Sequence, residues 1–190
     1  MGPLVGVLAL QGGFAAHEHA LTELGASTQH VRTVGDLTGL DALVMPGGES
    51  TTMSKLLETS ALFDPIAELI GQGFPIFGTC AGMILLARDV QDGRPDQRSF
   101  GAINMDVRRN AYGRQLDSFE ADIEVATFDT PFHAVFIRAP QVMIAADTVE
   151  VLAKHDDNIV LARENAITVA SFHPELTADT RIHELFIRNL

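Results

Sequence analysis

The feature that most constrains the fold is a repeated order of apolar runs, glycine-containing turns and helix-forming runs in the first half of the chain. Short apolar runs predict strands at residues 4–10, 27–32, 42–45 and 74–77. Helix-forming runs alternate with them at residues 14–24, 51–58 and 65–70. Such alternation is typical of βαβ units, in which parallel strands form a central sheet and helices cover both faces. The sequence therefore predicts an α/β fold, a three-layer α/β/α sandwich with a mostly parallel central sheet.

The second half of the chain is richer in strands. Runs typical of strands occupy residues 120–126, 134–137, 149–154, 159–163 and 166–172. The polar turn at residues 156–158 predicts a hairpin, and residues 178–189 predict a closing helix. The polar stretch 90–99 is expected to be a mobile loop. With 190 residues and no internal repeat, the chain is expected to form a single domain over residues 1–190.

Cys80 is the only cysteine, and it lies where a predicted strand gives way to a predicted helix. An apolar run ends at Gly78, and a helix-forming run begins at Ala81. A sharp strand-to-helix turn of this kind exposes one reactive side chain at the edge of a sheet and is called a nucleophile elbow. The N–H groups of the following helix can stabilise a thiolate and hold a developing oxyanion. Free cysteine is also among the most buried residue types, so a packing role is the alternative.

A β-rich run near the C-terminus leads into His173, Pro174 and Glu175. In extended backbone, residues two positions apart point to the same side, and Pro174 favours that backbone for His173. The carboxylate of Glu175 is therefore expected to reach the imidazole and fix its tautomer. A cysteine, a histidine and a carboxylate can serve as nucleophile, base and orienting group. The alternative is an ordinary strand end with a polar histidine and a solvated glutamate.

A third candidate segment is the Pro-Gly-Gly turn at residues 46–48, which follows the apolar run 42–45. Ser50 or Thr51 is expected to cap the helix after it. Two consecutive glycines allow backbone N–H groups to approach a ligand closely. The turn can therefore supply donors to an oxyanion or to the polar groups of a substrate, although an ordinary strand–turn–helix link has the same pattern.

Together these segments resemble the class I, or triad, glutamine amidotransferases. The Gly-Thr-Cys-Ala-Gly elbow at residues 78–82, the Pro-Gly-Gly turn and the His-Pro-Glu segment carry the resemblance. It implies a flavodoxin-like fold and hydrolysis of L-glutamine to L-glutamate and ammonia through a thioester. The implied catalytic residues are Cys80, His173 and Glu175, and the implied oxyanion donors are at Gly48 and Ala81. The implied glutamine-binding residues are Gly48, Glu49, Ser50, Arg109, Ile137 and Arg138.

Further blocks narrow the resemblance to the glutaminase subunits of pyridoxal 5′-phosphate synthases. They lie in order along nearly the whole chain, at residues 6–12, 46–53, 109–115, 117–122, 135–140 and 171–177. The resemblance implies that ammonia passes to a synthase subunit within a large hetero-oligomer, for vitamin B6 biosynthesis. The resemblance associates residues 11–13 with the surface that docks the synthase subunit. No bound cofactor is expected, because neither of the two lysines, Lys55 and Lys154, is a candidate for a Schiff base in a glycine-rich pocket.

Two other functions stay open on the sequence alone. A glutaminase of the same class could serve a different acceptor, as in histidine or purine biosynthesis. A non-catalytic binding or regulatory module could also keep the fold. Such a module would have no chemical need for Cys80, His173 and Glu175 together, which argues against it.

Composition and spacing limit the partners. The formal net charge of −12 argues against nucleic acid or an anionic membrane surface. One cysteine permits no internal disulfide, and the sequence shows no signal peptide or membrane-length apolar run, so a cytoplasmic location is expected. His17, Glu18 and His19 suggest metal at first sight, but positions two apart do not face each other on a helix. They are expected on a solvated helix face, and no metal site is predicted.

Overall fold

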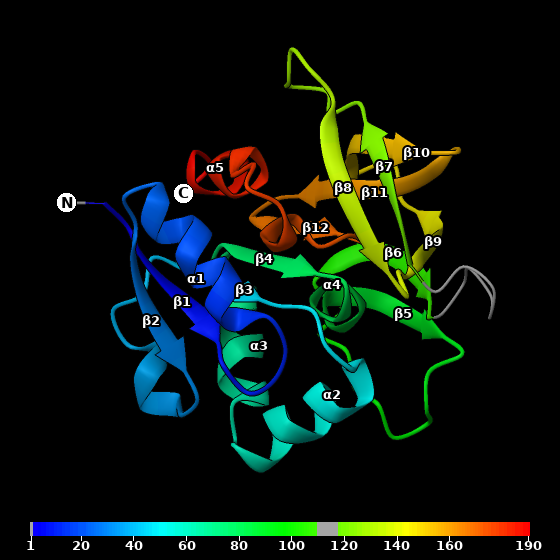
Figure 1. The fold of residues 1–190 in the computed structure, drawn as a ribbon. Coiled ribbons are helices and arrows are strands. Elements are labelled where there is room, and N and C mark those ends of the chain that lie inside the picture. The colour runs from blue at the N-terminus through cyan, green and yellow to red at the C-terminus, as the bar shows by residue number, and fades with distance from the viewer. Residues whose placement is uncertain (1, 110–117) are drawn as a thin grey trace.

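The structure is a computed structural model that describes residues 2–109 and 118–190; parts of two sequence blocks, at positions 110–115 and 117, lie outside these ranges. Its centre is a seven-stranded sheet with the order β10-β11-β12-β4-β3-β1-β2 (Figure 1). The strands are β1 (Leu4–Leu8), β2 (Ser27–Val31), β3 (Ala42–Met45), β4 (Ile76–Thr79), β10 (Glu150–His155), β11 (Asn158–Glu164) and β12 (Ile167–Ala170). The strands from β2 to β12 in this order pair in parallel, whereas β10 and β11 are antiparallel additions. The order β2-β1-β3-β4-β12 is flavodoxin-like, so the predicted fold class is confirmed.

Two hydrophobic cores lie on opposite faces of this sheet. Alternate strand residues point to opposite sides, so Ala42 and Val44 pack into one core, and Leu43 and Met45 into the other. The first core is covered by α1 (Phe14–Glu23) and α5 (Arg181–Ile187). The second is covered by α2 (Ser50–Thr59), α3 (Phe63–Gly71) and α4 (Ala81–Leu86). A short 3-10 helix, η1 (Val34–Leu37), follows β2.

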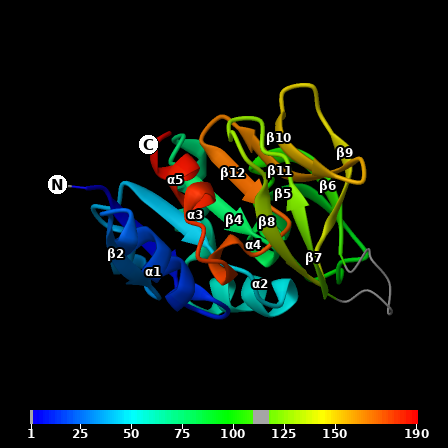
Figure 2. The ribbon, with the colours of Figure 1, turned by 45° about the horizontal axis from the view of Figure 1, so that its top comes forward.

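Two smaller sheets extend the molecule at the end opposite β2, as Figures 1 and 2 both show. One contains β5 (Ala87–Gln91), β6 (Ile103–Arg108) and β9 (Gln141–Ala145), and the other is the antiparallel pair β7 (Ser118–Ile123) and β8 (Phe132–Ile137). β5, β6 and β9 were not predicted from the sequence, and the end of β5 lies in the stretch 90–99 that was predicted to be a loop. β5 and β9 show no regular alternation of buried and exposed residues, whereas β6 alternates, with Ile103, Met105 and Val107 buried, so its signal was present in the sequence and was overlooked.

The predicted hairpin at residues 156–158 is confirmed as the turn between β10 and β11. Asp156 and Asp157 have φ angles of 46° and 64°, and aspartate tolerates this left-handed conformation better than most residues. In the described part of the chain, no helix combines the length and apolarity that a membrane span requires.

Candidate active site

A cavity of about 220 Å³ lies at the carboxyl edge of the parallel strands. The turn after β3, the elbow after β4, the ends of β6 and β8, and the segment after β12 form its wall. The residues that line it are Gly48, Glu49, Ser50, Cys80, Ile84, Arg109, Ile137, Arg138 and His173. The structure therefore brings together all six predicted glutamine-binding residues with Cys80 and His173. Ala81 and Glu175 are buried and do not line the cavity.

The elbow at Cys80 is sharply bent and firmly held. Cys80 has φ 48° and ψ −102°, a conformation that costs a non-glycine residue about 1–3 kcal/mol. Its N–H donates to the carbonyl of Ala170 on β12 at 2.8 Å, and its carbonyl accepts from Ile84 of α4 at 3.1 Å. A Cβ at Gly82 would lie 2.1 Å from the carbonyl oxygen of Met45, so only glycine lets α4 begin this close to β3. The cysteine thus lies where the elbow pattern predicted.

His173 and Glu175 meet as expected, but through a different backbone. β12 ends at Ala170, and residues Pro174–Leu176 form a 3-10 helix, η2, rather than extended chain. The predicted extended backbone is therefore wrong, because Pro174 fits the first position of a helix as well as a strand. The contact itself is confirmed, since His173 Nδ1 lies 2.8 Å from Glu175 Oε1.

The electrostatics of this pair favour a charged imidazole. Burial disfavours the cation of His173, but hydrogen bonds to Cys80 and Glu175, together with their charges, raise its pKa to about 10. Burial also acts to raise the pKa of Glu175, yet the hydrogen bond from His173 and the charges of nearby histidines hold it below its usual value. At neutral pH the site therefore holds an imidazolium between a carboxylate and a sulfur that can carry negative charge. The sulfur lies 3.8 Å from the carbonyl oxygen of Ile137.

The turn at residues 46–48 packs directly against the imidazole. A Cβ at Gly47 would lie 2.4 Å from His173 Cε1, so a side chain cannot be placed there. Gly48 has φ 155°, and the next N–H, of Glu49, donates to Gln11 Oε1 at 3.2 Å. The loop after β1 thereby fixes the turn after β3. The resemblance associated Gln11 with the docking surface, and its contact with this turn was not predicted.

Glu49, rather than Ser50 or Thr51, caps α2. Its carboxylate accepts from the N–H groups of Thr51 at 3.1 Å and Thr52 at 2.8 Å. The predicted cap is therefore wrong by one or two positions, because a glutamate side chain is long enough to fold back over the first turn. The hydroxyl of Ser50 is left buried beside the cavity, without a hydrogen bond to the described residues.

The two arginines of the cavity differ. Arg109 donates to Thr51 at 2.7 Å, Gln97 at 2.8 Å and Glu49 at 2.8 Å, so its guanidinium is already engaged. Burial opposes the charge on Glu49, but hydrogen bonds from Thr51 and Thr52 and the charge of Arg109 lower its pKa to about 2. Arg138 is exposed, has φ 44°, and makes no ion pair with the residues that the structure describes. Its guanidinium is the one available to a ligand carboxylate.

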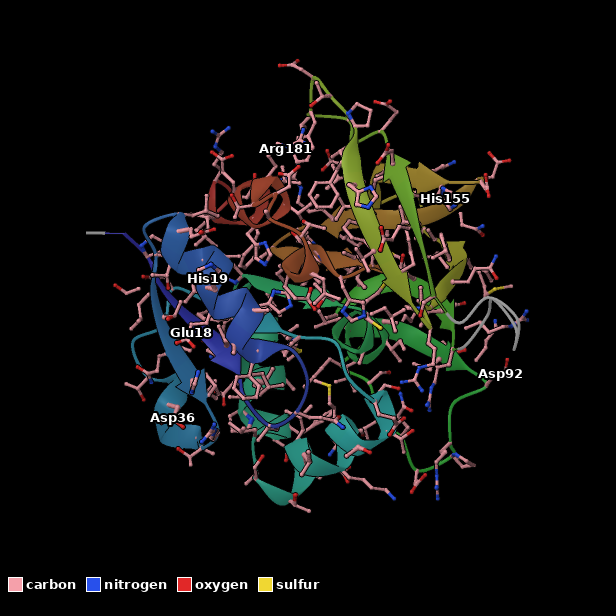
Figure 3. All side chains as sticks on the ribbon, viewed as in Figure 1. Glu18, His19, Asp36, Asp92, His155 and Arg181 are labelled. Carbon is pink, nitrogen blue, oxygen red and sulfur yellow. The ribbon has the colours of Figure 1, made fainter. Side chains whose placement is uncertain are left out.

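The prediction that His17 lies on a solvated helix face is wrong. His17 is fully buried, because α1 turns residues 17, 20 and 21 toward the sheet at the spacing of one helix face. Glu18 and His19, labelled in Figure 3, are not buried: the side chain of His19 is exposed, and the carboxylate of Glu18 lies 2.9 Å from Nε2 of His30. The apolar spacing along α1 was the signal that could have identified His17. Among residues 2–109 and 118–190, no three histidine, cysteine or acidic side chains form a metal-binding group.

Solved structures define the class of protein. A crystal structure of a glutamine amidotransferase matches with a TM-score of 0.92 and 46% sequence identity, over 97% of each chain. The structure of PurLQS from Thermotoga maritima matches with a TM-score of 0.69 at 15% identity, which shows the fold alone. The fold is that of the glutamine amidotransferases, in agreement with the resemblance seen in the sequence.

Sequence comparisons identify the family. Proteins named pyridoxal 5′-phosphate synthase subunit PdxT are similar over almost their full length. Those of Frankia alni and Mycobacteroides abscessus are each 52% identical over 98% of this chain, which corresponds to 94% and 97% of their own lengths. That of Thermosipho africanus is 51% identical over 96% of both chains. The model of the SNO glutamine amidotransferase family matches residues 7–190, and the chain belongs to this family.

Proposed function

We propose that this chain is the glutamine-hydrolysing subunit of a pyridoxal 5′-phosphate synthase. In this proposal it converts L-glutamine to L-glutamate and delivers the ammonia to a synthase subunit. The observation that carries the proposal is the cavity in which the strained Cys80 lies beside His173, itself bonded to Glu175 at 2.8 Å. Membership of the family and similarity to the PdxT proteins support the same activity.

The first half of the reaction forms a thioester. The sulfur of Cys80 attacks the side-chain amide carbon of glutamine, with His173 as the cation that has taken the thiol proton. In this proposal the N–H groups of Gly48 in the turn and Ala81 in the elbow hold the oxyanion, and one such donor contributes about 3 kcal/mol in comparable enzymes. His173 then gives its proton to the departing nitrogen, which leaves as ammonia.

The second half hydrolyses the thioester. Neutral His173 takes a proton from a water molecule, and the oxygen attacks the acyl carbon. The carbon–sulfur bond breaks, glutamate leaves, and the proton on His173 again pairs with the sulfur of Cys80. Glu175 stays ionised throughout, because its role is to orient His173 and stabilise its cation.

Substrate orientation depends on the wall of the cavity. A free amino acid carries an α-carboxylate, which the unpaired guanidinium of Arg138 can bind, and the buried hydroxyl of Ser50 can bond a further polar group. Arg109 and Glu49 hold each other at 2.8 Å and so shape the rim, while the carbonyl of Ile137 lies near the sulfur. The polar wall suits a small zwitterion better than an apolar ligand.

The test combines the purified chain with the synthase subunit encoded by the same organism. Glutamine labelled at its amide nitrogen is supplied, and both glutamate and pyridoxal 5′-phosphate are analysed. The proposal predicts glutamate release and label in the pyridoxal ring. Glutamate release without label in that product would favour a different acceptor. No glutamate release, alone or with the synthase subunit, would favour a non-catalytic module.

A further inference from the structure

A second pair of histidines lies behind the candidate triad and takes no part in the mechanism above. His17 on α1 and His183 on α5 are both fully buried. His17 Nδ1 lies 2.9 Å from His183 Nε2. On its other side, His17 Nε2 lies 3.1 Å from Thr79 Oγ1 and 3.3 Å from Glu175 Oε2. Because Thr79 precedes the elbow and Glu175 bonds the triad histidine, this pair touches the site at two points.

The two oxygens of the Glu175 carboxylate have different surroundings. Oε1 accepts from His173 at 2.8 Å. Oε2 is buried and has no hydrogen bond of good geometry within the described residues, and His17 Nε2 at 3.3 Å faces it. A carboxylate can only accept, and a buried oxygen without a donor is costly. The nitrogen of His17 that faces this oxygen must therefore carry a proton.

This requirement fixes the tautomers of both histidines. With its proton on Nε2, His17 has a lone pair on Nδ1, which must accept from the Nε2–H of His183. His183 then has a bare Nδ1, and that atom is the buried one without a partner. The opposite assignment would aim a lone pair of His17 at the carboxylate and leave His183 with an unpaired buried N–H. Burial lowers the pKa of His17. Burial, together with the repulsion that a protonated His17 would exert, lowers the pKa of His183 to about 3, so both rings are neutral at pH 7.

We infer that His17 is a positioning residue of the candidate active site, held in its Nε2–H tautomer by His183, and that it fixes the Glu175 carboxylate that orients His173. The arrangement extends the triad into a chain of five side chains from the elbow to α5. The effect of this arrangement on glutamine hydrolysis rests on the proposed function, whereas its effect on the reactivity of the Cys80 sulfur does not.

The titratable groups that belong to or face this row of five side chains come from every element packed around it. α1 contributes His17, α5 contributes His183, the η2 segment contributes His173 and Glu175, and the elbow contributes Cys80. β4 contributes two neutral groups, the hydroxyl of Thr79 and the ring of Phe77, which lies edge-on to both buried histidines. Removing the group that faces Oε2 leaves the carboxylate of Glu175 free to rotate, so its 2.8 Å contact with His173 loosens and the imidazole is held less firmly beside the sulfur of Cys80.

The experiment measures the alkylation rate of Cys80 by iodoacetamide at neutral pH, which is specific because the chain has one cysteine. His17→Leu removes the donor, and we expect alkylation about tenfold slower, equivalent to about one pKa unit on the imidazole–thiol pair. His17→Gln can place an amide N–H near the position of Nε2 and should recover most of the rate. His19→Leu is the matched control, because His19 lies on the same helix with an exposed side chain, and it should react like the wild type.

Glutamine hydrolysis supplies the second readout. His17→Leu should lower kcat about tenfold with KM nearly unchanged, since it acts through Glu175 rather than on substrate. Equal alkylation rates in wild type and folded His17→Leu would overturn the inference, as would equal defects in the Gln and Leu variants. A wild type that alkylates normally but hydrolyses no glutamine would overturn the proposed function instead. If His17→Leu does not fold, nitrogen NMR of the wild type decides: a proton on Nδ1 of His17 contradicts the inference.

Discussion

Cys80 and Arg138 share an unusual backbone, with φ angles of 48° and 44°. Non-glycine residues rarely adopt such angles, and each costs about 1–3 kcal/mol unless the surroundings enforce it. Both residues line the same cavity, at the ends of β4 and β8. At Cys80 this backbone conformation directs the sulfur to the cavity. At Arg138 it follows the last residue of β8, and the guanidinium there makes no ion pair with the described residues. Strained positions that converge on one cavity support a functional rather than a packing role for this cysteine.

The raised pKa of His173 makes a prediction about pH. Because its folded pKa is about 10, the imidazolium is present at neutral pH and is lost as the pH rises through that value. We expect kcat/KM for glutamine to fall on the alkaline side with the loss of this cation, which donates the proton to ammonia. The raised pKa also contributes to the free energy of unfolding. This contribution is fully present below the ordinary histidine pKa and is lost as the pH rises through about 10. A profile in which activity instead requires the loss of a proton near pH 10 would contradict this assignment.

Glu175→Gln tests the orienting role. The amide keeps the size of the side chain but cannot stabilise the imidazolium, so kcat should fall more than KM rises. His173→Asn removes the acid–base group itself and should lower kcat on the order of 10²–10⁴-fold, the more severe loss. Steady-state glutamate release measures both variants. Full kcat in Glu175→Gln would reduce Glu175 to a structural residue.

At the scale of elements, the turn between β3 and α2 is predicted to tolerate no side chain at Gly47. In Gly47→Ala the new Cβ would lie 2.4 Å from His173 Cε1, so the imidazole must move and kcat should fall at least tenfold. Gly71→Ala is the matched control, because a Cβ at that end of α3 has no atom within 4 Å. Comparing kcat for the two variants separates displacement of the imidazole from a general effect of glycine replacement; equal kcat would contradict the geometry.

Glu164 joins β11 of the central sheet to β6 of the three-stranded sheet. Its buried carboxylate accepts from the N–H of Asn104 at 2.7 Å, the Asn104 amide at 2.9 Å and the hydroxyl of Thr148. Burial acts to raise its pKa, but these hydrogen bonds from Thr148 and Asn104 hold it below the usual value. Its stabilising contribution is therefore present above the ordinary glutamate pKa and is lost as the pH falls through the folded one.

Glu164→Gln should lower the free energy of unfolding by about 1–3 kcal/mol at neutral pH, because one amide –NH₂ would face a donor. The difference from wild type should shrink in acid. Urea unfolding at both pH values measures this, with exposed Glu124→Gln as the control. A loss of stability independent of pH would show that the charge of Glu164 is not what joins the two sheets.

On the scale of the whole molecule, the parallel half of the sheet and the triad segments were predictable, because apolar runs and glycine turns mark each βα unit locally. The three-stranded sheet was less predictable, since β5 and β9 show no alternating pattern, although β6 alternates and could have been recognised. The buried role of His17 was also missed, because it depends on η2 and α5 folding back over α1 from the other end of the chain. Sequence patterns identify which residues can react, while long-range packing decides which of them support the reaction.

The most direct test of the account is glutamate release from L-glutamine by the wild type and by Cys80→Ala, each with the synthase subunit present. Circular dichroism confirms that both proteins are folded. The account predicts steady release by the wild type and none above background by Cys80→Ala, because the variant lacks the sulfur that forms the thioester. Release by Cys80→Ala at a rate near that of the wild type would contradict the central claim that this cavity hydrolyses glutamine through Cys80.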